Sequence, residues 1–258
     1  MIDLHFREYG TGKPVLILHG LFGSGENWMS VGNALQEHFR LYLVDQRNHG
    51  DSPHTDTFSY PELAEDVYQF VGAHSLGTVS LIGHSMGGKT AMEFTLDHPD
   101  MVERLVVVDI APREYPPRLE HLLFALRDLD LSTVKTRKDA EEALAQAVPE
   151  RKVRLFLLKN LERTGKNSFT WKINLDALAS HYEEVVKSVE KKGRQFDGPV
   201  LFIKGERSDY IEESDMDEIR SLFPRAEMKT IPHAGHWLHA EAQSRFVELC
   251  REFLNWNS

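Results

Sequence analysis

Residues 79–88 read VSLIGHSMGG, and this stretch decides the fold of the chain. A short apolar strand pattern runs into a turn, and an amphipathic helical pattern follows over 86–97. Glycines stand two places before and two places after Ser85, where a tight strand-to-helix turn needs small residues beside neighbouring backbone. A serine on such a turn presents its hydroxyl at the carboxyl end of a sheet strand. We therefore predict that Ser85 is a nucleophile.

A second His-Ser-X-Gly sequence occurs at Ser75. Ala73, and not a glycine, stands two places before it. The helical pattern 60–73 precedes this serine and a strand pattern follows it, which is the reverse of the order that the turn requires. We expect Ser75 to lie in the loop that enters the strand.

Short apolar runs rich in Val, Ile and Leu recur along the chain and alternate with helical patterns. Such bounded runs are typical of strands buried in a parallel sheet, and the alternation predicts helices on both sheet faces. We predict an α/β fold with a mostly parallel sheet flanked by helices. Its strands are expected at 14–18, 41–45, 79–83, 104–109, 199–205 and 227–231, and its helices at 27–38, 60–73, 86–97, 214–223 and 240–255.

The segment 112–196 differs from the rest because helical periodicity dominates it and no bounded strand run stands out. Helices are expected at 119–129, 137–148, 150–161 and 176–192. We interpret the segment as a helical cap inserted between two sheet strands, with 1–111 and 197–258 forming the core. A connection of this length commonly acts as a lid over a site. The alternative is a set of extra helices that only bury sheet surface.

Composition limits the possible partners. The chain has 258 residues, a net charge of −10, 41% hydrophobic residues and one cysteine. A nucleic-acid-binding protein needs a concentrated basic surface, which this balance disfavours. No apolar run approaches the length of a membrane span, and the N-terminus has no signal-peptide pattern. We expect no nucleic-acid partner, no membrane span and a cytoplasmic location, with Cys250 as a core residue.

The general base is sought among the histidines that follow the last predicted strand. His233, His236 and His239 all lie in PHAGHWLHAE. Gly235 lets the loop turn so that the imidazole of His236 reaches the serine, and we predict His236 as the base. His239 is expected at the surface or in a helix cap. His19 and His84 are expected to be structural.

Two backbone N–H groups are expected to bind the oxyanion that forms on the substrate. One belongs to Leu21, in the glycine-rich loop after the first buried strand, and the other to Met86, which follows the nucleophile. Apolar side chains of these loops and of the cap are expected to line the substrate pocket. They are Phe22, Trp237, Phe156 and Trp171.

Taken together, four motifs resemble those of the α/β-hydrolase superfamily over nearly the whole chain. They are HGLFGS at 19–24, DQRNHGDS at 45–52, GHSMGG at 83–88 and AGHW at 234–237. With VVDIAP at 107–112, they are especially similar to the abhydrolase-domain serine esterases, a group of bacterial acyl esterases and mitochondrial relatives. The resemblance implies an ester or thioester hydrolase with a helical cap and with neither cofactor nor metal. It also implies that 45–52 is a structural turn, so neither Asp45 nor Arg47 is assigned a catalytic role.

The acid that orients the base is the point where the sequence departs from the common family pattern, Gly-X-X-Asp. Here the stretch after Gly205 is GERSDY, so Ser208 holds the expected place and Asp209 comes one residue late. Asp109 offers an alternative at the carboxyl end of the strand RLVVVD, where sites of open α/β sheets gather. The esterase group also tends to show this arrangement. We favour Asp109 and keep Asp209 as the alternative.

These features predict a serine carboxylesterase for small or medium acyl esters, with the triad Ser85, His236 and Asp109. An acyl-CoA thioesterase would use the same machinery, and Arg151, Lys152 and Arg154 would then help to hold phosphates. A C–C hydrolase or lyase of the same fold is another alternative, because fold and triad do not decide the substrate. A ligand-binding receptor with little turnover is the alternative from a different class.

Overall fold

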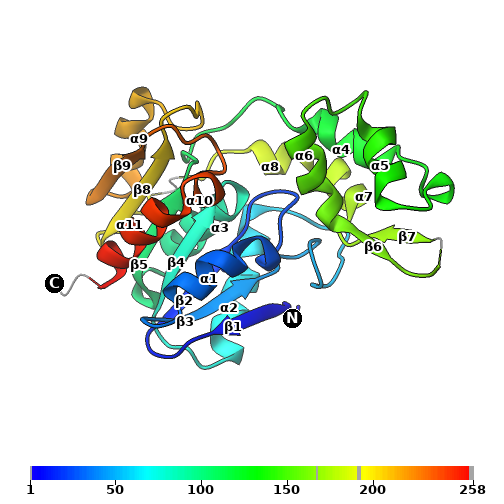
Figure 1. Cartoon of the computed structure of the whole chain (residues 1–258). Coiled ribbons are helices and arrows are strands. Elements are labelled where there is room, and N and C mark those ends of the chain that lie inside the picture. Colours follow the sequence, from blue (N-terminus) through cyan, green and yellow to red (C-terminus); the bar gives the residue numbers. More distant parts are fainter. Residues whose placement is uncertain (1, 167, 191–192, 256–258) are drawn as a thin grey trace.

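The computed structural model describes residues 2–166, 168–190 and 193–255 (Figure 1). Its centre is a seven-stranded sheet in the order β1-β3-β2-β4-β5-β8-β9. Only β1 runs antiparallel to its neighbour, and the other adjacent pairs are parallel. The strands are β1 (Phe6–Tyr9), β2 (Pro14–Leu18), β3 (Arg40–Val44), β4 (Val79–His84), β5 (Val102–Val108), β8 (Val200–Gly205) and β9 (Ala226–Ile231).

Helices cover both faces of this sheet and bury an apolar core on each. Side chains of α2, α3 and α9 form one core with the sheet, and side chains of α1, α10 and α11 form the other. None of the helices within the described ranges is both long and apolar enough to cross a membrane. The flanking helices are α1 (Met29–Leu35), α2 (Tyr60–Ala73), α3 (Met86–Asp97), α9 (Met216–Leu222), α10 (Leu238–Glu241) and α11 (Gln243–Asn255).

The predicted fold class is confirmed. The six predicted strands all occur. Five of them are apolar runs buried within the sheet, and the sixth, β9, alternates apolar and polar residues at the exposed sheet edge. Strand β1 was not predicted, since its four residues FREY alternate on a partly exposed sheet edge and carry no apolar run. Cys250 is buried among the helix and sheet side chains, as expected.

Residues between β5 and β8 form a separate group of elements that Figure 1 shows together beyond the end of the sheet. They bury their own apolar cluster, which also contacts Leu21, Phe22 and Met86 of the core. The elements are α4 (Glu120–Arg127), α5 (Arg137–Leu144), α6 (Arg151–Leu157), β6 (Leu161–Arg163), β7 (Phe169–Trp171), α7 (Leu175–Ser180) and α8 (Tyr182–Val186).

Two features of this segment differ from the sequence prediction. Strands β6 and β7 form an antiparallel hairpin where no strand was expected, because three-residue strands leave no periodic signal. The predicted helix 176–192 is divided at His181 into α7 and α8, and the chain is no longer helical from Lys187 to Glu190. The last two positions of that prediction, 191 and 192, lie outside the described residues.

Candidate active site

Ser85 occupies a strained turn between β4 and α3. Its φ of 51° and ψ of −117° are rarely adopted by residues with a side chain, and such strain typically costs about 1–3 kcal/mol. The two motif glycines allow the turn to form. A Cβ on Gly87 would lie 2.3 Å from the carbonyl oxygen of Leu18, and one on Gly83 would lie 2.3 Å from the carbonyl oxygen of Gly87.

A hydrogen bond joins the predicted base to one of the two candidate acids. His236 Nδ1 lies 2.7 Å from Asp109 Oδ2, and the Asp109 carboxylate is fully buried. The other carboxylate oxygen accepts a bond from the Gly205 N–H at 2.9 Å, and the Ser208 hydroxyl donates to Oδ2. Because a carboxylate only accepts, Nδ1 of His236 carries the proton and Nε2 keeps a lone pair.

Asp209 lies elsewhere. Its side chain is 66% exposed and pairs with Arg118 at 2.7 Å. The one-residue shift in GERSDY thus places Ser208 at the position of the common family acid, where its hydroxyl supports Asp109. The structure brings Asp109, and not Asp209, to the imidazole.

His84 and His19 hold the loops around the serine. His84 Nε2 donates to the carbonyl oxygen of His236 at 2.9 Å and so anchors the loop that carries the predicted base. His19 Nδ1 donates to the Gly20 carbonyl, while its Nε2 accepts a bond from the Gln46 N–H at 3.0 Å. Burial lowers the pKa of both histidines, which keeps them neutral.

The expectation that His239 lies at the surface or in a helix cap is wrong. Its ring is buried, stacks on Trp28 with centroids 4.2 Å apart, and also approaches His84. The reason is that α10 is a separate four-residue helix that packs this side chain inward before α11 begins. Burial lowers the pKa of His239 to about 3.

The two predicted oxyanion donors adjoin the serine. Met86 begins α3, so its N–H has no partner within the helix and lies at the positive end of the helix dipole. Leu21 lies across the site in the loop after β2, and within the described part of the chain its N–H pairs with no protein acceptor. Both N–H groups are therefore available to a ligand.

Two small cavities meet at Ser85, and Leu21 also lines both. The first, of about 60 Å³, is here called the His236 lobe. The second, of about 40 Å³, is called the Lys89 lobe. Phe22, Phe156 and Trp237 line the His236 lobe together with His236, as the sequence predicts.

Trp171 does not join them. It pairs with Leu161 across the β6–β7 hairpin and lines a separate surface depression with His54 and Arg127. The unpredicted hairpin is the reason, because it holds this side chain away from Ser85. The expectation that Trp171 lines the substrate pocket is therefore corrected.

Tyr210 was not identified from the sequence, although it ends the stretch GERSDY. Its ring stacks on the His236 imidazole with centroids 3.9 Å apart and an angle of 18° between the planes. Arg118 lies 5.7 Å from the centre of the Tyr210 ring, and the same arginine pairs with Asp209. The stack restricts the orientation of the imidazole from the side of the Lys89 lobe.

Lys89 was also not identified, because a lysine in a helix is usually a solvated surface residue. It is buried in α3, and its ammonium donates to the carbonyl oxygens of Val186, at 3.2 Å, and Lys187. The ammonium also lies 4.9 Å from the centre of the Tyr115 ring. Burial, assisted by the nearby charge of Arg113, lowers the pKa of Lys89 to about 7.

Replacing Lys89 is expected to alter how stability depends on pH. The folded pKa of about 7 lies below the ordinary value of 10.5, so between these pH values the unfolded chain binds more protons. The contribution of Lys89 to the free energy of unfolding therefore rises with pH across this window. Urea denaturation measures this. The free energy of unfolding of the wild type minus that of Lys89→Met should become more positive from pH 7 to pH 10. A difference that stays flat or falls would contradict the lowered pKa.

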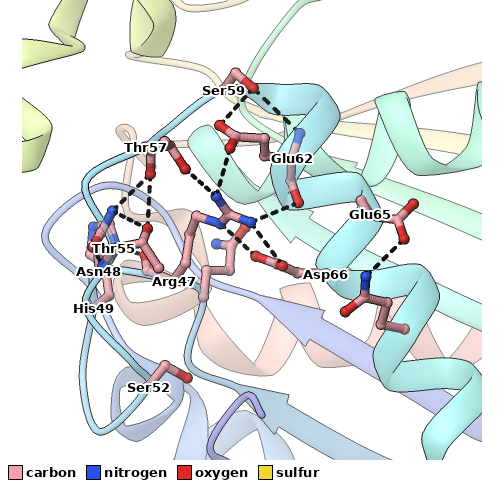
Figure 2. A network of polar contacts seen from close by, with 12 residues as sticks. Arg47, Asn48, His49, Ser52, Thr55, Thr57, Ser59, Glu62, Glu65 and Asp66 are labelled. Carbon is pink, nitrogen blue, oxygen red and sulfur yellow. Dashed lines mark hydrogen bonds and ion pairs between the residues drawn. The ribbon is translucent and has the colours of Figure 1, made fainter. Parts of the chain in front are cut away.

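The turn 45–52 is held by buried polar contacts (Figure 2). Arg47 binds both carboxylate oxygens of Asp66, at 2.6 and 2.9 Å, and also contacts Thr57 and Glu62. Its guanidinium is thus occupied. Asn48, the next residue, accepts backbone and side-chain bonds from Asn174 of the cap segment. The turn therefore ties the segment between β5 and β8 to the core.

Asp45 is occupied in the same way. Its carboxylate accepts bonds from the N–H groups of Gly25 and Asp51, at 2.6 and 2.9 Å, and contacts His5 Nδ1 at 2.9 Å. Asp51 in turn pairs with Lys172. These contacts make Asp45 and Arg47 parts of the scaffold, which agrees with giving them no catalytic role.

Comparisons with known proteins agree with this architecture. A family model described as the alpha/beta hydrolase fold matches residues 13–243. The chain is 39% identical over 252 residues to the sn-1-specific diacylglycerol lipase ABHD11 of Mus musculus, covering 95% of this chain and 81% of that protein. It is 35% identical over 246 residues to esterase YbfF of Escherichia coli, covering 95% and 94%. A solved marine microorganism esterase superposes with a TM-score of 0.95 at 44% identity, covering 98% of this chain and 100% of the other.

Proposed function

The chain belongs to the α/β-hydrolase family, and on that premise we propose that it is a serine carboxylesterase for small or medium acyl esters. The observation that carries this proposal is the 2.7 Å bond between His236 and the buried Asp109, in a site where His236 and Ser85 line one cavity. Its relatives in mouse and Escherichia coli are named a lipase and an esterase.

In the first half of the reaction, the Ser85 hydroxyl attacks the ester carbonyl carbon while Nε2 of His236 takes its proton. The electron pair of the carbonyl moves to oxygen, which the Leu21 and Met86 N–H groups bind. The oxyanion then collapses, the bond to the alcohol breaks, and His236 gives its proton to the departing oxygen. An acyl group remains on Ser85, and Asp109 stabilises the transient imidazolium.

In the second half, water takes the place of the alcohol. His236 removes a proton from the water as its oxygen attacks the acyl carbon, and the same two N–H groups bind the oxyanion. Collapse breaks the bond to Ser85, and His236 returns the proton to the serine oxygen. The products are a carboxylic acid and an alcohol, and the cap segment 112–196 serves as a lid over both steps.

The thioesterase alternative has less support from the charges of the cap. Arg151 pairs with Glu141 at 2.8 Å, and Arg154 donates to the carbonyl oxygens of Val148 and Pro149. Two of the three basic side chains suggested for phosphate binding are therefore already engaged. We rank acyl-CoA below a simple ester for this reason.

Turnover of 4-nitrophenyl acetate, butyrate and octanoate tests the proposed function. We expect kcat/KM to be higher for the acetate and butyrate than for the octanoate, since cavities of about 60 and 40 Å³ suit short chains. We also expect a fluorophosphonate to label Ser85 irreversibly. A protein that binds these esters without turning them over would favour the receptor, and one inert toward all of them would overturn the esterase.

A further inference from the structure

The Lys89 lobe places two basic side chains beside the nucleophile, although the chain as a whole has a net charge of −10. Among the described residues that line it, Lys89 and Arg118 are basic and none is Asp or Glu. The His236 lobe, by contrast, is lined by apolar and aromatic side chains, one asparagine and histidines. The two lobes therefore differ in the kind of group that they can receive.

Within the part of the chain that the structure describes, the ammonium of Lys89 makes its hydrogen bonds to backbone and not to a carboxylate, although the nearby charges of Glu114 and Glu218 raise its pKa against the effect of burial. Its ammonium bonds two backbone carbonyl oxygens, which leaves one of its three N–H donors. Tyr60 and Tyr115, whose ring centres lie 5.5 and 4.9 Å from the ammonium, both line the lobe, so the ammonium lies at its wall. Burial disfavours the charged form of an ammonium that contacts no carboxylate, and an anion bound beside it would stabilise that charged form.

Arg118 adds a second cation at the exposed side of the lobe. Both side chains of its ion pair with Asp209 are exposed, the arginine to 38% and the aspartate to 66%. Solvent therefore screens the attraction between them. A guanidinium has five N–H donors and can serve an additional acceptor without releasing Asp209. Lys89, which is buried, is therefore the main basic group that an anion in the lobe would contact, and Arg118 supports it.

The position of the base decides which part of an ester enters this lobe. His236 must protonate the departing alcohol oxygen, and His236 lines the other cavity and not this one. The alcohol therefore lies in the His236 lobe. The acyl chain, which leaves the carbonyl carbon in the opposite direction, extends into the Lys89 lobe.

We propose that the Lys89 lobe selects acyl chains that end in a carboxylate, so that monoesters of short dicarboxylic acids are preferred substrates. This inference rests on the esterase function proposed above and goes further by naming the acyl class. Lys89 acts as a specificity determinant. The small volume of the lobe restricts the acyl chain to a few carbons.

The test compares monoethyl succinate with ethyl succinamate, its uncharged amide of the same shape, by titrating released acid. In the wild type, kcat/KM should be about 10- to 100-fold higher for the carboxylate, as for one hydrogen bond between charged groups. In Lys89→Met this ratio should fall close to one. Because both esters are measured on the same variant, loss of folded enzyme cancels from the ratio.

Lys204→Met is the matched control. Lys204 also donates its ammonium to a backbone carbonyl, that of Ile211 at 2.7 Å, but it lines neither lobe. This variant should keep the wild-type ratio. Should Lys89→Met not fold, inhibition of the wild type by succinate and by butyrate replaces it. Succinate should bind at least about 10-fold more tightly than butyrate, which is the lower limit expected for a hydrogen bond between its second carboxylate and Lys89.

The outcomes separate this inference from the proposed function. If the wild type hydrolyses both ethyl esters with equal kcat/KM, the lobe does not select carboxylates and the esterase stands. If 3-acetoxypropanoate, with the carboxylate on its alcohol side, is preferred over its amide while the succinate pair is not, the acyl assignment is wrong. If neither these esters nor 4-nitrophenyl acetate is turned over, the esterase itself fails.

Discussion

Ser85→Ala is expected to lower kcat on 4-nitrophenyl acetate by about 10⁴- to 10⁶-fold, the range seen when a serine nucleophile is removed. The physical reason is that Ser85 carries the only hydroxyl of the strained turn between β4 and α3. The Met86 N–H at the start of α3, which we propose as an oxyanion donor, lies next to it. Alanine fits the site sterically, since it only removes an oxygen. Steady-state kinetics with the purified variant measure the change in kcat. The thermal unfolding midpoint of the variant, compared with that of the wild type, verifies that it is folded.

Ser75→Ala is the matched control for this variant. Ser75 has the same neighbours in sequence, His-Ser-X-Gly, and the same φ of 51°, but it is exposed at the end of α2 and before β4. Its removal should leave kcat unchanged within a factor of about two, as for a surface substitution far from the chemistry. Residual activity of Ser85→Ala above one tenth of the wild type would refute the assignment of the nucleophile.

Asp109→Asn is expected to lower kcat by about 10⁴-fold, because an amide in place of the carboxylate favours the wrong imidazole tautomer and removes the charge that stabilises the imidazolium. The asparagine can still accept a bond from the Gly205 N–H, which bonds Asp109 at 2.9 Å. The backbone at this position also has a φ of 51°, which asparagine tolerates better than most residues. The measurement is kcat against pH, together with circular dichroism to verify folding.

Asp209→Asn distinguishes the two acids. Its exposed carboxylate holds Arg118 and does not contact His236, so kcat on a neutral ester should change less than about threefold, as expected for one surface ion pair. A collapse of activity in Asp209→Asn, with Asp109→Asn remaining active, would reverse the assignment. It would mean that the loop after β8 rearranges when substrate binds.

Part of the site could be predicted because its signals are local. At the turn around Ser85, Gly83 leaves room for backbone a few residues further along the chain, and Gly87 leaves room for backbone of the adjacent strand β2. Both requirements therefore appear in the sequence as a short motif. The same holds for the buried strands, whose apolar runs reflect burial on both faces. The sequence also predicted His236, since it follows the last predicted strand and comes directly after Gly235.

Other parts depend on contacts between distant segments. Asp109 and Asp209 could not be separated with certainty from the sequence, because the deciding contact joins residues 127 positions apart. Trp171 was misplaced because a hairpin of two three-residue strands, which leave no periodic signal, holds it away from the site. Lys89 and Tyr210 were missed because their roles come only from packing against α8 and the imidazole.

The sequence by itself thus determined the fold class of this protein and predicted its nucleophile and its base, since steric and burial requirements along a few consecutive residues leave a readable pattern. Only the tertiary structure decided which carboxylate meets His236, which side chains line the two lobes, and that a buried lysine lies at the wall of one of them. Those features arise where chain segments far apart in sequence meet. A distance of a few ångströms there depends on the packing of the whole sheet and cap, and no short stretch of residues encodes it.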